Sequence, residues 1–220
     1  MATTQQAIDA IVEQGMLPLY FNADETVSIE ILKAVYKAGV KAIEYTSRGA
    51  TALSNFAKMV EVRNAEMPGL LLGIGTVKTL AQAKEYLAIG ADFLVSPGYV
   101  KKIAKYAVAN DVLYAPGCMT PTEIIAAETA GVKFIKLFPG DTLGPKYLSA
   151  IKPVFPNLVF MPTGGVDTSK ENIEGWFKAG VSAVGMGSKL ISKQLMDAKD
   201  YATIESATKE VFATILSIKK

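Results

Sequence analysis

Short apolar segments alternate with longer amphipathic segments along this chain of 220 residues. Most apolar segments are followed by a turn rich in glycine or proline, and several amphipathic segments end directly before a glycine. Buried strands that alternate with helices are typical of parallel βαβ units. The pattern therefore predicts an α/β fold with strands at residues 16–21, 41–46, 70–75, 91–96, 112–115, 132–138, 158–161 and 182–185.

The amphipathic segments between these strands predict the helices. We expect them at residues 1–15, 22–38, 50–63, 79–89, 99–109, 120–130, 144–151 and 169–179, followed by a helical tail at 188–217. Eight βα units in a chain of this length favour a closed (β/α)8 TIM barrel, with an N-terminal helix and a helical C-terminal tail, as one domain over residues 1–220. The alternative is an open doubly wound sheet, but its GxGxxG motif is missing after the first strand.

The composition narrows the possible chemistry. The chain has no histidine, which excludes a Ser-His triad and a histidine zinc site, and we expect neither a metal nor a cofactor. The formal net charge is +2 with scattered basic residues, so nucleic acid is not expected as a partner. No apolar run is long enough for a membrane span, and the first residues lack the basic start of a signal peptide. The single cysteine, Cys118, is consistent with a reducing compartment, and we expect a cytoplasmic protein.

A lysine occupies the middle of the apolar segment VKFIKLFPG, residues 132–140. Because side chains alternate along a strand, Lys136 shares a face with Phe134 and Phe138 and would lie between two aromatic rings. Burial lowers the pKa of an amine, and a neutral lysine is a nucleophile that forms Schiff bases with carbonyl compounds. The alternative is a lysine whose stem packs while its amine reaches solvent at the strand end, a role that suits Lys133 better.

Two further charged residues lie at the end of the second strand, where a barrel carries its active site. Glu44 has the parity of Ala42 and Thr46, so we expect it inside the barrel, where an acid must be paired or used in proton transfer. A structural ion pair with Lys136 or Arg48 is the alternative. Arg48 has the planar group that binds a carboxylate, although loop arginines are often simply solvated.

Glycine-rich turns close the seventh and eighth strands, at residues 163–165 and 185–188. Glycine lets backbone N–H groups approach an anion, and we expect a helix to begin after Ser188 with its N-terminus toward the same place. In (β/α)8 barrels these two loops often bind phosphate. Tight turns without a ligand are the alternative.

Seven stretches of the sequence, in order over nearly the whole chain, resemble the class I 2-keto-3-deoxy-6-phosphogluconate (KDPG) aldolase and 4-hydroxy-2-oxoglutarate aldolase family. They are KAIEYTSR, GIGTV, FLVSPG, APGCMTPTE, KFIKLFPG, MPTGGV and GMGSKL. The resemblance implies a metal-independent lyase that acts on a 2-keto acid and assembles as a homotrimer. It implies that Lys136 forms the Schiff base and that Glu44 transfers protons. It also implies substrate contacts: Arg48 and Thr76 to the carboxylate of the pyruvate moiety, Pro97 and Phe138 beside it, Thr163 near the hydroxyls, and Gly164, Gly165, Gly187 and Ser188 at the phosphate.

The resemblance leaves three functions open. The first is cleavage of KDPG, or of its galactonate epimer, to pyruvate and glyceraldehyde 3-phosphate, and Thr163 favours the gluconate type. The second is cleavage of unphosphorylated 4-hydroxy-2-oxoglutarate to pyruvate and glyoxylate. The first strand ends in Phe21 and Asn22 without the basic residue expected there, which removes one phosphate partner. The third is a non-catalytic barrel that binds phosphorylated metabolites.

Overall fold

The structure is a computed structural model that describes residues 2–219. Its strands are β1 (Met16–Tyr20), β2 (Ala42–Thr46), β3 (Leu71–Gly75), β4 (Phe93–Val95), β5 (Leu113–Ala115), β6 (Gly117–Cys118), β7 (Phe134–Leu137), β8 (Val159–Pro162) and β9 (Val184–Met186). Each of the eight expected strands is present, and the two-residue β6 is additional. Every strand pair is parallel, which confirms the predicted α/β class.

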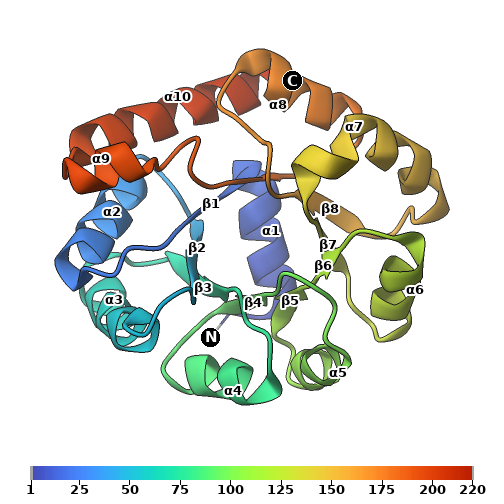
Figure 1. The fold of residues 1–220 in the computed structure, drawn as a ribbon, viewed down its shortest axis with the longest axis horizontal. Helices are drawn as coiled ribbons and strands as arrows, with labels where there is room; N and C mark the ends of the chain where they lie inside the picture. The colour runs from blue at the N-terminus through green and yellow to red at the C-terminus, as the bar shows by residue number, and fades with distance from the viewer. Residues whose placement is uncertain (1, 220) are drawn as a thin grey trace.

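The helices alternate with the strands and surround them (Figure 1). They are α1 (Thr4–Gln14), α2 (Glu25–Lys37), α3 (Ala52–Glu66), α4 (Leu80–Ala88), α5 (Lys101–Ala109), α6 (Pro121–Thr129), α7 (Gly140–Ile151), α8 (Lys170–Lys178), α9 (Lys193–Asp197) and α10 (Tyr201–Lys219), with a 3-10 turn η1 (Lys152–Val154) after α7. Helix α7 begins earlier than expected and is broken by the non-helical Gly144. No helix within residues 2–219 has both the length and the apolar character needed to cross a bilayer.

The strands form two parallel sheets, in the order β5-β4-β3-β2-β1-β9 and β6-β7-β8. The chain passes from one sheet to the other at Pro116, which separates β5 from β6. At the other end, Thr163 directly after β8 forms a bridge with Gly185 in β9. The two sheets therefore meet both between β5 and β6 and between β8 and β9.

The hydrophobic core has two parts. The larger part lies where the outward side chains of the strands pack against the surrounding helices. The smaller part lies inside the curled sheet and includes Leu17, Ala42, Phe93, Leu113, Phe134, Met161 and Ala183. Helix α1 contributes Ala7, Ile8 and Ile11 to this interior part, and Figure 1 shows α1 at the centre of the ring of helices. Most of these inner strand residues lie at or next to the first residue of their strands, whereas Met161 lies further along β8. Thr4 at the start of α1 donates to the carbonyl of Asp111 before β5, and Gln14 at its end bonds to Ala42, so α1 covers the amino ends of the strands.

Local sequence explains how α1 reaches this position. Thr3 caps the helix, and Gly15 ends it in the left-handed conformation, with a φ of 74°, so that β1 begins at the next residue. The side chain of Gln14 accepts hydrogen bonds from the N–H groups of Lys41 and Ala42 and donates one to the carbonyl of Ala42. These bonds join the end of α1 to the start of β2.

The C-terminal tail corrects one prediction. We expected a helix from residue 188, but residues 188–191 form a turn, α9 begins at Lys193, and the chain bends again before α10. Ser192 caps α9 by accepting from the N–H of Leu195, and Lys199 has a φ of 53°, which an α-helix does not allow. The expected helix N-terminus directly after Ser188 is therefore wrong.

Candidate active site

Lys136 lies in the middle of β7, between Gly117 of β6 and Met161 of β8. Its side chain is only 7% exposed, and its Nζ lies 3.9 Å from Oε1 of Glu44 and 5.2 Å from the ring centroid of Phe138. This burial excludes the alternative in which the amine escapes to solvent, whereas Lys133 is exposed. The predicted parity is confirmed, because Phe134, on the same face, belongs to the interior core.

Burial lowers the pKa of Lys136, because the charged ammonium loses its hydration. The carboxylate of Glu44 acts in the opposite direction, and the positive charge of Arg48 lowers the pKa further. The net direction is downward from the ordinary value of a lysine. The amine is therefore neutral, and hence nucleophilic, over a wider pH range than a surface lysine.

Glu44 is fully buried in β2 and faces the interior, as its parity predicted. Burial raises its pKa, while Lys136 and Arg48 act to lower it. Within residues 2–219 neither of its carboxylate oxygens receives a hydrogen bond. A buried acid that serves only as a structural ion pair normally has its oxygens satisfied by donors. The arrangement favours a carboxyl group that exchanges protons with a neighbour.

Two glycines of β3 make room for large side chains inside the sheet. A Cβ at Gly73 would overlap the ring of Phe93, and a Cβ at Gly75 would overlap the carboxylate of Glu44. Glycine is the residue that permits such close approach. The GIG sequence at residues 73–75 thus explains how an acid is accommodated next to Lys136.

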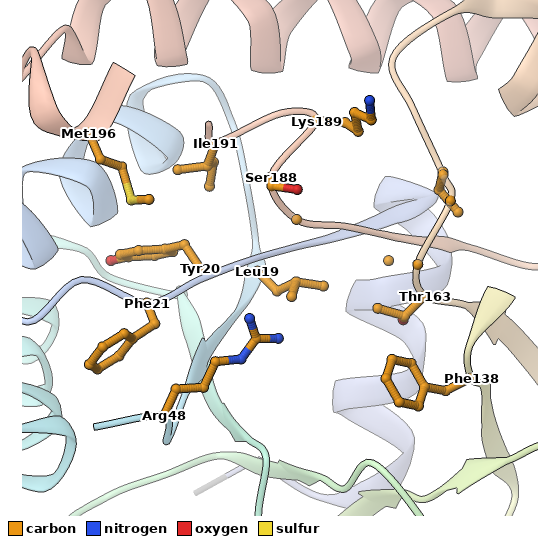
Figure 2. Close-up of a pocket in the computed structure, with 15 residues that line it drawn as sticks. Leu19, Tyr20, Phe21, Arg48, Phe138, Thr163, Ser188, Lys189, Ile191 and Met196 are labelled. Atoms are coloured by element: carbon orange, nitrogen blue, oxygen red, sulfur yellow. The ribbon is translucent and has the colours of Figure 1, made fainter. Parts of the chain in front are cut away.

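A cavity of about 340 Å³ lies at the carboxyl ends of the strands. Seven of the predicted site residues line it: Arg48, Phe138, Thr163, Gly164, Gly165, Gly187 and Ser188. Figure 2 shows the side chain of Arg48 extending into this space, with Phe138 and Thr163 on another side. Arg48 is exposed at the same time, so it combines contact with solvent and a place in the cavity wall.

The glycine turn after β8 needs its two glycines. Gly164 and Gly165 have φ values of 92° and 70°, and a Cβ at Gly165 would lie only 2.5 Å from the Cβ of Asp141. The turn is held because Thr163 donates from its N–H to Leu137 and accepts from the N–H of Gly140 at its carbonyl. Within the described chain the N–H groups of Gly165 and Ser188 make no hydrogen bond, and unpaired amides in a cavity wall can bind an anion.

The side-chain hydroxyl of Thr163 is buried without a hydrogen-bond partner among residues 2–219. A Cβ at Gly185 would overlap the Oγ1 of Thr163. Because an unpaired buried hydroxyl is costly, it is a candidate contact for a substrate hydroxyl.

Thr76 and Pro97 lie near the site but are not among the described residues that line the cavity. Thr76 directly follows Gly75 and has a φ of 65°, which is strained for a threonine. The backbone of Pro97 lies against Gly117, which is the neighbour of Lys136 in the β6–β7 register. Thr76 is thus connected to Glu44 through Gly75, and Pro97 to Lys136 through Gly117.

Part of the cavity wall could not be assigned from the sequence. Leu19, Lys189, Ile191 and Met196 also line it. Phe21 lines it as well, at the strand end where a basic phosphate partner was expected. The apolar run of the first strand indicated that Leu19 is buried but not that it contacts a cavity. The other three belong to the tail, where the expected continuous helix concealed the turn that brings them to the mouth.

Lys136 and Glu44 are not among the described residues that line the cavity, but they adjoin its wall. The Lys136 amine lies 5.2 Å from the ring centroid of Phe138, and the charge of Arg48 acts on both groups. Among residues 2–219 no group of three or more histidine, cysteine, aspartate and glutamate side chains is placed to hold a metal ion. A buried amine whose pKa is lowered can form a Schiff base with a ketone, and a neighbouring acid whose pKa is raised can assist the proton transfers that this requires.

Comparison with known proteins agrees with this chemistry. A family model described as KDPG and KHG aldolase matches residues 8–207. The chain is 32% identical over 203 residues to the 2-dehydro-3-deoxy-phosphogluconate aldolase of Pseudomonas aeruginosa, covering 90% of this chain and 88% of the relative. It is 31% identical over 158 residues to the 2-dehydro-3-deoxy-6-phosphogalactonate aldolase of Escherichia coli, covering 71% and 75%.

Solved structures give the same result. The KDPG aldolase of Legionella pneumophila, captured with pyruvate as a covalent carbinolamine intermediate, has a TM-score of 0.83 and 26% identity, covering 92% of this chain and 96% of that one.

Proposed function

Because this chain belongs to the KDPG and KHG aldolase family, we propose that it cleaves KDPG to pyruvate and glyceraldehyde 3-phosphate. It is a lyase of the class I type, which works through a Schiff base. The observation that carries the proposal is the buried Lys136 amine, 3.9 Å from the Glu44 carboxylate and next to Phe138, which lines a cavity together with the glycine turns.

The reaction begins with attack of the neutral Lys136 amine on the C2 ketone of the substrate, which gives a carbinolamine. Glu44, in its protonated form, donates a proton to the departing hydroxyl, and loss of water leaves a cationic iminium. The raised pKa of Glu44 suits this step, because a larger fraction of the acid is protonated at neutral pH.

The iminium then serves as the electron sink for carbon–carbon cleavage. Removal of the C4 hydroxyl proton lets the C3–C4 bond break, its electrons pass to the iminium, and the aldehyde leaves. Protonation of the resulting enamine at C3 and addition of water release pyruvate and restore the Lys136 amine. Glu44 becomes a carboxylate when it gives its proton to the departing hydroxyl, and this carboxylate is the base that removes the C4 hydroxyl proton. One residue thus acts first as the acid and then as the base.

We assign to the remaining site residues the roles that the family resemblance implied. The guanidinium of Arg48, together with Thr76, binds the substrate carboxylate, and Pro97 and Phe138 pack beside the pyruvate moiety. Thr163 contacts a substrate hydroxyl, which its unpaired Oγ1 supports. Gly164, Gly165, Gly187 and Ser188 bind the phosphate, supported by their place in the cavity wall.

Two other substrates are close competitors. The galactonate epimer of KDPG is favoured by the similarity to the phosphogalactonate aldolase, and unphosphorylated 4-hydroxy-2-oxoglutarate by the description of the family. Steady-state cleavage of the three substrates, with and without inorganic phosphate as competitor, ranks them. A preference for 4-hydroxy-2-oxoglutarate that phosphate does not affect would overturn the choice of KDPG.

The decisive experiment traps the Schiff base. The protein is incubated with pyruvate and borohydride, its intact mass is measured, and the modified peptide is mapped, with Lys136→Met as the matched control. We expect one pyruvyl adduct on Lys136 in the parent and none in the variant. Absence of the adduct from folded parent protein in excess pyruvate would reject the aldolase and support a barrel that only binds phosphorylated metabolites.

The proposal also covers the architecture, the oligomeric state and the cellular compartment. Residues 1–220 form one domain whose two sheets close into a (β/α)8 barrel, supported by the Thr163–Gly185 bridge. The barrels assemble as a homotrimer, supported by the exposed apolar side chains of Met119, Ile125 and Val154, and sedimentation equilibrium tests this. The protein works in the cytoplasm, where the free thiol of Cys118 stays reduced.

A further inference from the structure

Lys189 lies in the wall of the cavity, next to Ser188 and the glycine turns. It follows β9 in the turn that the sequence analysis took for a helix. Figure 2 shows Lys189 beyond Ser188, on the other side of the cavity from Arg48, with the amine of its exposed side chain directed away from Arg48. The side chain must therefore turn inward to reach a ligand in the cavity. Lys189 forms no ion pair with any residue in 2–219, so its amine is available to a ligand.

The charges at this end of the cavity make Lys189 important. Arg48 and Lys189 are the two cations among the described lining residues, and Arg48 lies on the side of Lys136 and Glu44, whose pKa values it influences. Asp141 packs directly behind Gly164 and Gly165 and brings a carboxylate near the turn. Without Lys189, the part of the cavity wall formed by the glycine turns would offer neutral backbone amides, next to the negative charge of Asp141.

The first strand segment and the tail beyond Lys189, up to residue 219, supply no cation to the cavity wall. Leu19 and Phe21 of the first strand segment line it with apolar side chains, together with Ile191 and Met196 of the tail. A phosphate group carries nearly two negative charges, and its loss of hydration must be offset by donors and by opposite charge. Backbone amides provide donors but no net charge, and a lysine provides both.

We propose that Lys189 determines the preference for an aldehyde moiety that carries a phosphate. This inference rests on the proposed aldolase function and assigns the specificity for the far end of its substrate to one residue. The Lys189 amine pairs with the phosphate held by the glycine turns, while Arg48 binds the carboxylate at the other end. The two cations thus recognise the two anionic ends of one substrate, with the Schiff-base lysine between them.

The test compares KDPG with its dephosphorylated form, 2-keto-3-deoxygluconate. The variants are Lys189→Met, which keeps the length of the side chain and removes the charge, and Lys189→Arg, which keeps the charge. Lys101→Met is the matched control, because Lys101 is exposed at the first residue of α5 and lies outside the cavity wall. For each protein, kcat/KM is measured with both substrates at low and high salt.

We expect Lys189→Met to lower the ratio of the two kcat/KM values by about 10- to 100-fold, the usual effect of a hydrogen bond to a charged group. The loss should appear mainly in KM for KDPG and should weaken its dependence on salt. Lys189→Arg should restore most of the ratio, and Lys101→Met should leave it unchanged. An unchanged ratio in Lys189→Met, or an equal loss with both substrates, would overturn the inference.

The pyruvate adduct on Lys136 separates this inference from the function on which it rests. If the parent protein forms no adduct and cleaves neither substrate, the aldolase function fails. If the parent forms the adduct and cleaves both substrates, but Lys189→Met keeps the parent ratio, only the role of Lys189 fails.

Discussion

The carboxylate of Glu44 lies in the space that a side chain on Gly75 would occupy. Gly75 is the register partner of Thr46 in the neighbouring strand, and both β2 and β3 are buried there. The position of the acid beside Lys136 therefore depends on the absence of a side chain one strand away.

Replacing Gly75 by alanine should displace Glu44 and impair the site. The added methyl group must push the carboxylate aside, which should slow pyruvate adduct formation at least about tenfold and cost about 1–3 kcal/mol of unfolding free energy. Trapping rates and urea unfolding measure the two effects. Gly98→Ala is the control, because a Cβ at Gly98 would have no neighbour within 4 Å. Equal behaviour of the two variants would contradict the packing argument.

Replacing Thr163 by valine should separate function from stability. Valine has nearly the same shape but lacks the buried, unpaired hydroxyl, so the free energy of unfolding should stay the same or rise slightly. Cleavage of the hydroxylated substrate should fall by about 10- to 100-fold if Oγ1 donates to or accepts from it. Chemical unfolding and kcat/KM test the two expectations. A clear loss of stability would show that the hydroxyl has a partner within the fold.

The Lys136 amine should become reactive at a lower pH than the amine of an ordinary lysine. Since burial lowers its pKa from 10.5, acetylation of its neutral amine should reach half its maximal rate at a pH below 10.5. The positive charge of Arg48 lowers this pKa, so Arg48→Met should move the midpoint to higher pH. The carboxylate of Glu44 raises it, so Glu44→Gln should move the midpoint to lower pH.

Peptide mass spectrometry after brief treatment with acetic anhydride gives these midpoints. The exposed Lys133, on the same strand segment, serves as an internal reference in each digest. Shifts of the same sign in the two variants would show that a change in structure, rather than the removed charge, moves the pKa.

The ion pair of Asp92 and Arg63 should matter for stability rather than for chemistry. Both side chains are mostly buried near the amino ends of the strands, Asp92 accepts from the N–H of Leu72, and Arg63 donates to the carbonyl of Gly90. Asp92→Ala leaves the guanidinium without its acid and should cost about 3 kcal/mol.

Urea unfolding measures this cost, with the exposed Asp9→Ala as a control expected to stay within about 0.5 kcal/mol. Folded Asp92→Ala protein should still form the pyruvate adduct, because Asp92 directly precedes β4 at the amino ends of the strands, whereas the cavity lies at their carboxyl ends. Loss of the adduct in the folded state would contradict the structural role.

The sequence predicted the strands and the orientation of Glu44 and Lys136 because both follow from a local rule. Side chains in a strand alternate, so the parity of Ala42, Glu44 and Thr46 or of Phe134 and Lys136 can be counted without knowing the rest of the fold. The place of the site at the carboxyl ends of the strands follows from the same βαβ pattern.

The tail was predicted less well, because its helical pattern continues through residues that leave the helix. The positive φ of Lys199 is unusual for a lysine and gives no composition signal, while the cap at Ser192 is a short local feature inside a long apolar pattern. The contacts of Lys189 and Met196 with the cavity depend on this tertiary bend. Sequence periodicity cannot provide them.

Helix α1 fills one end of the interior of the curled sheet. Ala7, Ile8 and Ile11 close it at the amino ends of the strands, and the cavity opens at the other end. A substrate bound to Lys136 therefore has its pyruvate part on the closed side and its aldehyde part toward the opening. In the proposed reaction the covalent chemistry sets the order of release, because the aldehyde is freed when the C3–C4 bond breaks while pyruvate stays attached to Lys136 until water is added. The half that departs first is thus the half on the open side.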